Sequence, residues 1–183
     1  MHRELYFVLL KAFDRMTVLL RGKSLNPPAQ ALDFLDESWQ ELGETKTRRT
    51  SLKTMEKIFN KNIVDEQDAS TDEIIMNMYL YALSDFCLYA ETKDFNSLTA
   101  CKGSIIDFYD YVSSQKYARE QKEGRSFVCS DTDEAAIRSS SEYLKEMKSL
   151  EADIAFAKIN TDWSSVALYR FRSEQAASIG CAI

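Results

Sequence analysis

The chain has 183 residues, 45% hydrophobic and 28% charged, and it contains only five glycines and two prolines. This composition is typical of a globular domain with its own core, and so few turn residues disfavour β-sandwiches and barrels and favour an all-α fold. A net charge of −6 and a sequence pI near 5.0 argue against a nucleic-acid-binding protein, because neutralising phosphates requires an excess of lysine and arginine.

Apolar residues recur at steps of three and four along most of the chain, which predicts a single all-α domain over 1–183 with a flexible tail. Gly22 and Gly43 are expected to end the first two helices, and Ser70 or Thr71 to cap the fourth. The seven expected helices cover about residues 2–21, 27–42, 47–60, 71–92, 94–123, 132–159 and 162–175.

The fourth of these helices is apolar on nearly every side from Ile74 to Ala90. This run falls short of the roughly 20 residues that a bilayer span needs, and it contains Asp85, whose insertion into lipid is unfavourable. We therefore expect no membrane association. The pattern instead predicts the central helix of a bundle, covered by several others.

The polar residues of this helix form a narrow stripe, because Asn77, Tyr81, Ser84 and Asp85 are linked by steps of three and four. In the favoured interpretation, the stripe meets polar side chains of a neighbouring helix or reaches solvent at one edge. In the alternative, Asp85 is a buried carboxylate with a shifted pKa in a pocket. A buried charge requires a partner, and Arg15 of the first helix is the expected partner of Asp85.

The residue patterns of common catalytic and metal sites are missing from the sequence. The four cysteines form no CxxC pair and the single histidine is His2, so neither a zinc site nor a Ser-His-Asp triad is expected. There is also no Glu-x-x-His pair and no glycine-rich phosphate loop. We predict a protein that is not an enzyme and holds no metal or cofactor. Since the N-terminus does not read as a secretion signal, a cytoplasmic location with reduced thiols is expected.

Acidic residues gather in two segments that precede predicted helices. Helix capping accounts for the acids at helix starts, but Asp65, Glu66 and Asp68 lie before the predicted cap. An ordinary solvated loop is the alternative to a binding surface there. The candidate partner-binding residues in the two segments are Asp65, Glu66, Asp68, Asp131 and Asp133.

Several short motifs, taken in order along the chain, resemble the bacterial YjaG-like family, domain-of-unknown-function family 416. These motifs are Phe13-Asp14-Arg15-Met16, residues 34–42 (FLDESWQEL), Asp85-Phe86-Cys87, and Ser178-Ile179-Gly180 following Arg170 and Arg172. The resemblance implies an all-α fold with no established activity, and a link to sensor histidine kinases suggested by gene neighbourhoods. It singles out a structural polar network of Asp14, Arg15, Asp36, Trp39 and Asp85.

These observations together favour a non-catalytic domain that binds another protein. The most concrete form is an immunity protein that neutralises a bacterial toxin, with a basic toxin domain as the partner. One alternative, which follows from the family resemblance, is a regulator associated with sensor histidine kinase signalling, with a kinase as the partner. A second alternative, of another class, is an enzyme or small-ligand binder with a pocket near Asp85.

Overall fold

The computed structural model describes residues 3–44, 51–121, 131–167 and 170. These residues form helices and no strands, and a helical segment of residues 163–167 follows the last of the seven long helices. The predicted all-α fold is confirmed. The helices are α1 (Arg3–Gly22), α2 (Ala29–Leu42), α3 (Leu52–Lys61), α4 (Thr71–Thr92), α5 (Phe95–Gln121), α6 (Asp131–Arg138) and α7 (Ser141–Ile159).

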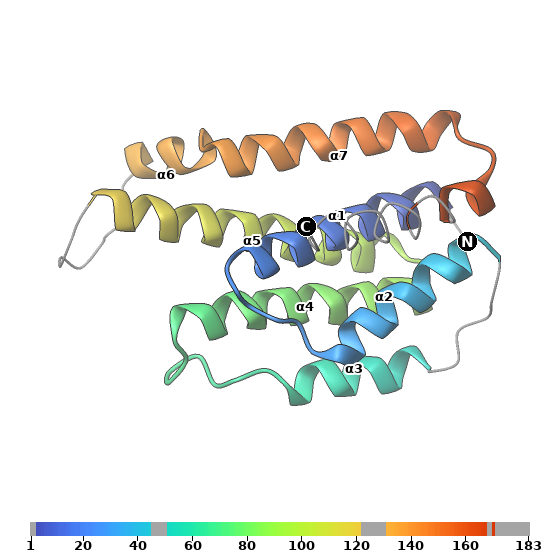
Figure 1. Cartoon of the computed structure of the whole chain (residues 1–183), viewed down its shortest axis with the longest axis horizontal. Helices are drawn as coiled ribbons and strands as arrows, with labels where there is room; N and C mark the ends of the chain where they lie inside the picture. Colours follow the sequence, from blue (N-terminus) through green and yellow to red (C-terminus); the bar gives the residue numbers. More distant parts are fainter. Residues whose placement is uncertain (1–2, 45–50, 122–130, 168–169, 171–183) are drawn as a thin grey trace, which may run out of the picture.

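The long helices lie roughly along one direction and stack side by side (Figure 1). In that view α7 runs along the top, α1 and α5 occupy the middle, and α4 and α3 lie below, with α2 crossing at an angle. α4 packs against α5, α3 and α1, whereas α1 also packs against α2 and α7. α1 therefore joins the C-terminal layer to the rest of the bundle.

An aromatic cluster fills the space between α1, α2 and α4. The Phe86 ring of α4 lies 4.9 Å from the Tyr6 ring, 5.3 Å from Phe13 and 5.8 Å from Phe34, measured between centroids. All four side chains are buried. Each such aromatic pair contributes about 0.5–1.5 kcal/mol beyond the area it removes from water, so this cluster fixes how α1 and α2 sit on α4.

Local capping signals set the ends of α4. Ser70, one of the two predicted caps, forms a capping box with Glu73: the Ser70 hydroxyl accepts from the Glu73 N–H at 3.3 Å, and the Glu73 carboxylate accepts from the Ser70 N–H at 2.8 Å. Lys93 ends the helix in a left-handed conformation with φ 58°. Asp94 then starts α5, accepting the Ser97 N–H at 2.8 Å.

Two predicted helix bounds are wrong. The single helix expected over 132–159 is two helices, because the Ser139 hydroxyl donates to the Ala136 carbonyl and Ser140 caps a new helix by accepting the Tyr143 N–H. The third helix begins at Leu52 and not near residue 47, since Ser51 is its extended N-cap. The expected helix over 162–175 is helical at 163–167, and residues beyond 170 lie outside the described part of the chain.

α4 is the predicted central helix, covered by α1, α3 and α5, but one side of it stays open. Tyr79 and Phe86 are buried, and both rings contact the Phe13 ring of α1. Tyr81 and Leu88 each follow one of these by two positions, which turns them to the opposite side of the helix. Tyr81 and Leu88 are each 41% exposed, so α4 keeps one open face. Among the described residues, no helix combines the length and the apolar character needed to cross a bilayer.

Candidate functional site

The loop between α3 and α4 is fixed to α4 by one buried amide. The Asn77 side chain accepts the Val64 N–H at 3.0 Å and donates to the Val64 carbonyl at 2.7 Å. Asn77 is 1% exposed, so both hydrogen bonds are shielded from water. A paired donor and acceptor of this kind imitates a strand neighbour, and it sets the position from which the acidic loop departs.

The predicted acidic residues of this loop all lie at the surface. Asp65, Glu66 and Asp68 are exposed, and Asp65 accepts the Gln67 N–H at 3.0 Å. Within the described part of the chain, none of these three carboxylates forms an ion pair. The loop therefore presents three exposed carboxylates directly after Val64, whose backbone is held by Asn77.

The second acidic segment is different. Asp133 of α6 accepts a hydrogen bond from the Tyr117 hydroxyl of α5 at 3.1 Å, so this carboxylate holds α6 against α5. The side chain of Asp131 lies outside what the structure describes. Of the candidate partner-binding side chains that the structure describes, those of the α3–α4 loop are exposed and form no ion pair with described residues.

The polar stripe of α4 meets polar side chains of both neighbouring helices. Ser84 donates to the Asn60 side chain of α3 at 3.3 Å, and the Ser104 hydroxyl of α5 donates to the Asp85 carboxylate at 2.5 Å. The favoured interpretation of the stripe is confirmed by these contacts. The expected Arg15–Asp85 pair is wrong, because Arg15 is bound to two carboxylates of α7 and Asp85 to Ser104 of α5.

Arg15 instead joins α1 to α7 through two carboxylates. Its guanidinium donates to both oxygens of Glu146, at 2.7 and 2.8 Å, and to Asp153 at 2.5 Å. Glu146 is 3% exposed and is therefore a charge that needs this partner. Glu146 and Asp153 lie on the same face of α7 as the apolar Leu150, at steps of four and three residues. Two acids on an apolar helix face indicate that another helix supplies a basic partner.

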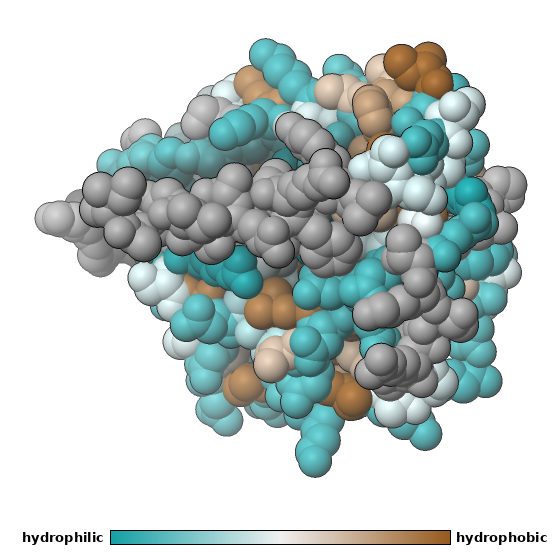
Figure 2. All heavy atoms as spheres, turned by 45° about the vertical axis from the view of Figure 1, so that its right-hand side comes forward, coloured by the Kyte–Doolittle hydropathy of each residue, from teal (hydrophilic) through white to brown (hydrophobic). Residues whose placement is uncertain are grey.

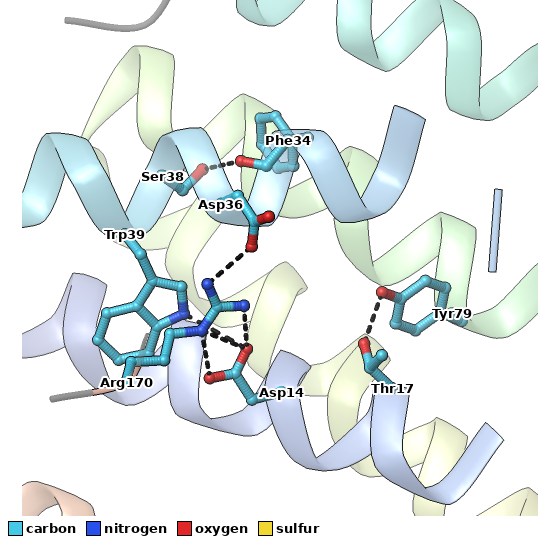
Figure 3. A network of polar contacts seen from close by, with 8 residues as sticks. All are labelled: Asp14, Thr17, Phe34, Asp36, Ser38, Trp39, Tyr79 and Arg170. Atoms are coloured by element: carbon cyan, nitrogen blue, oxygen red, sulfur yellow. Dashed lines mark hydrogen bonds and ion pairs between the residues drawn. The ribbon is translucent and has the colours of Figure 1, made fainter. Parts of the chain in front are cut away.

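Three of the predicted network residues do meet, around an arginine that the spacing arguments did not place. Figure 3 shows the Arg170 guanidinium between Asp14 and Asp36, beside the Trp39 ring. Arg170 donates to Asp14 at 2.9–3.2 Å and to Asp36 at 2.8 Å, and it lies 5.3 Å from the Trp39 ring centroid. The Trp39 indole N–H donates to Asp14 at 3.3 Å.

The electrostatic balance at Asp14 has opposing causes. Burial raises the pKa of the Asp14 carboxyl above its ordinary value, while Arg170 and the Trp39 N–H act in the opposite direction. Thr17, one turn further along α1, forms a 2.9 Å hydrogen bond with the buried Tyr79 hydroxyl, and burial also raises the pKa of Tyr79 (Figure 3). These groups hold neighbouring parts of the bundle together.

The features of an active site are weak in the described residues. Cys87 and Cys101 are buried, and burial raises the pKa of the Cys101 thiol well above its ordinary value, which disfavours a nucleophilic role. No group of three or more metal-ligating side chains occurs within the described ranges. A cavity of about 190 Å³ between α5 and α6 does not include Asp85; its lining residues are Asp110, Ser114, Glu134, Ile137 and Arg138.

The surface adds little apolar character on the face seen in Figure 2. That face is mostly teal, and its brown hydrophobic residues form small separate groups.

A scan against models of protein families, a search of curated proteins and a search of solved structures all find no match to this chain.

Proposed function

We propose that this protein is a non-catalytic protein-binding domain, most concretely an immunity protein that neutralises a basic bacterial toxin domain. The observation that carries this proposal is the α3–α4 loop, where Asp65, Glu66 and Asp68 are exposed and unpaired within the described structure. Because Asn77 fixes the start of this loop at Val64, part of the ordering that binding requires is already complete in the free protein.

Charge supports the same partner class. A protein with net charge −6 and a concentrated acidic loop attracts a basic partner from a distance, and such steering raises association rate constants by roughly 10- to 1,000-fold. A nuclease toxin needs a basic groove to hold its phosphate substrate, and an acidic protein that enters the groove excludes that substrate.

The other polar groups of the bundle support a binding role more than a catalytic one. Arg15 and Arg170 are each held by two carboxylates, and Asp85 is held by Ser104. These pairs hold parts of the bundle together, so the groups that form them are already engaged within the protein. The YjaG-like resemblance stays a prediction, and it adds no catalytic residue.

The first test is a pull-down from the native host with the full chain as bait, read by mass spectrometry and repeated at increasing salt. We expect recovery of a basic protein that is lost at high salt and lost with the variant D65K/E66K/D68K. The matched control is E4K/D33K/E151K, which changes the net charge equally at three exposed acids elsewhere and should retain the partner.

The recovered protein is then expressed alone and with this chain. Arrest of growth by the basic protein, relieved by the wild-type chain and not by D65K/E66K/D68K, supports an immunity role. Recovery of a histidine kinase would point to the regulator instead. Equal loss of binding by both triple variants, or recovery of no basic protein, overturns the proposal.

A further inference from the structure

The open face of α4 carries an apolar strip. Tyr81 and Leu88, each 41% exposed, lie two turns apart on this face, and the half-buried Ile74 and Met78 extend it toward the start of the helix. These four positions follow the steps of four, three and seven residues at which one helix presents anchors to another. α1 contacts Tyr79 and Phe86, so Tyr81 and Leu88 lie on the opposite side of α4 from α1.

Hydrogen bonds on both sides hold this strip in place. Ser84 is bonded to Asn60 of α3, and Asp85 is bonded to Ser104 of α5, so the neighbouring helices flank the strip and do not cross it. The Ser84 hydroxyl and one carboxylate oxygen of Asp85 thereby have partners within the protein. A partner that lies on Tyr81 and Leu88 therefore covers polar groups that are already partly satisfied.

The strip continues into the acidic loop. Asn77 lies one turn before Tyr81 on the same face, and it binds both backbone groups of Val64, whose side chain is exposed. Asp65 follows directly. The exposed apolar surface at Val64, Tyr81 and Leu88 therefore has concentrated negative charge at one end, next to the start of α4.

We propose that the open face of α4 receives an amphipathic helix of a protein partner, whose apolar side lies on Tyr81 and Leu88 and whose basic end meets the acidic loop. This inference rests on the proposed function, which it deepens by naming the recognised element. The charge pattern decides the orientation: the carboxylates of the acidic loop lie at one end of α4 without an ion pair in the described structure, whereas Glu91 at the other end is paired with Lys53 of α3. A second copy of this chain fits less well, because two molecules of net charge −6 repel each other.

Photo-crosslinking tests the position of the partner. Full-length bait carrying a benzophenone amino acid at position 81 or 88 is illuminated in native-host lysate, and the crosslinked peptides are sequenced. Val18, 68% exposed on α1, is the matched apolar control position. We expect crosslinks from 81 and 88, but not from 18, to one helical segment with basic residues at its end, in the same basic protein that the pull-down recovers.

Affinity then separates the two proposals. The variant Y81S/L88S should weaken binding of the recovered protein by about 30-fold or more, as expected for central apolar anchors, while V18S should not. If D65K/E66K/D68K abolishes binding and Y81S/L88S leaves it unchanged, the proposal that α4 receives a helix is overturned and the proposed function stands. Crosslinks between copies of this chain, or to an acidic or non-helical segment, also overturn the proposal that α4 receives a basic helix. Failure of both variants to affect binding overturns both proposals.

Discussion

Two consecutive residues of α1 hold two different parts of the C-terminal third of the chain. Arg15 binds Glu146 of α7, and Asp14 binds Arg170. Successive side chains of a helix point about 100° apart, so adjacent positions can reach different neighbours. Each of these charges is largely removed from water, and each is tolerated because its partner arrives with correct geometry.

The carboxylate of Asp94 provides a pH-dependent test at this scale. Interactions with Thr92, and with the backbone and hydroxyl of Ser97, lower the pKa of Asp94 from 3.8 to about 2. A lowered folded-state pKa means that the stabilisation is complete above the unfolded value and is lost as the pH falls toward 2. The variant D94N keeps a capping oxygen and removes the charge. We expect the wild type to exceed D94N in free energy of unfolding above pH 4, and the difference to shrink toward pH 2.

Urea denaturation across pH 2 to 6 measures this difference directly. The control D94A also removes the cap, which typically costs about 1 kcal/mol, so it should be the least stable at every pH. A constant difference between wild type and D94N over this range would contradict the assignment.

At the scale of whole elements, the sequence predicted the helices and the central place of α4, but not which of its apolar side chains stay exposed. Ser70 and the acids that follow it predict the start of α4, because helix capping depends on a local sequence pattern. Tyr81 belongs to the polar stripe, for which solvent at one edge is an expected outcome, but Leu88 is as apolar as the buried Phe86, so its exposure could not be predicted. When a helix is apolar on nearly every side, its sequence alone does not indicate which side is exposed.

The candidate site was predictable only in part, for a related reason. The resemblance grouped Asp14, Asp36 and Trp39 correctly, but their shared partner Arg170 lies 156 positions from Asp14. Arg15 was assigned to Asp85, although its acids on α7 are 131 and 138 positions away. Ion pairs between distant helices leave no spacing pattern; what they leave is a charged residue on an apolar face.

Asn77 tests whether the acidic loop is a fixed element. The variant N77A leaves the N–H and carbonyl of Val64 without their buried partner, which should cost roughly 1–3 kcal/mol of unfolding free energy. The Val64 amide should also exchange with deuterium much faster, as seen by mass spectrometry of the loop peptide. The control S84A loses a single hydrogen bond, to Asn60, which is exposed to solvent, and should change the free energy of unfolding by about 0.5 kcal/mol or less. Matching behaviour of the two variants would show that Asn77 does not hold the loop.

At the scale of the whole molecule, α7 is a layer attached mainly to α1. It also contacts α5 and α6; Arg15 of α1 binds its Glu146 and Asp153, and Lys116 of α5 binds its more exposed Glu142. A layer held by few strong contacts can open before the rest of the protein unfolds. α4 and α5, which pack closely against each other, should be the last part to open.

The variant R15A should therefore act on one layer more than on the whole. It leaves Glu146, 3% exposed, as a buried charge without its cation, and breaking such a pair typically costs about 3–5 kcal/mol. Native-state hydrogen exchange should show a larger fall in protection for α7 than for α4 and α5. The double variant R15M/E146L replaces the pair with apolar side chains and should recover most of the lost stability. An equal fall in all helices would mean that α7 and the core unfold as one cooperative unit, and failure of R15M/E146L to recover would mean that packing around the pair, and not its charge, holds the layer.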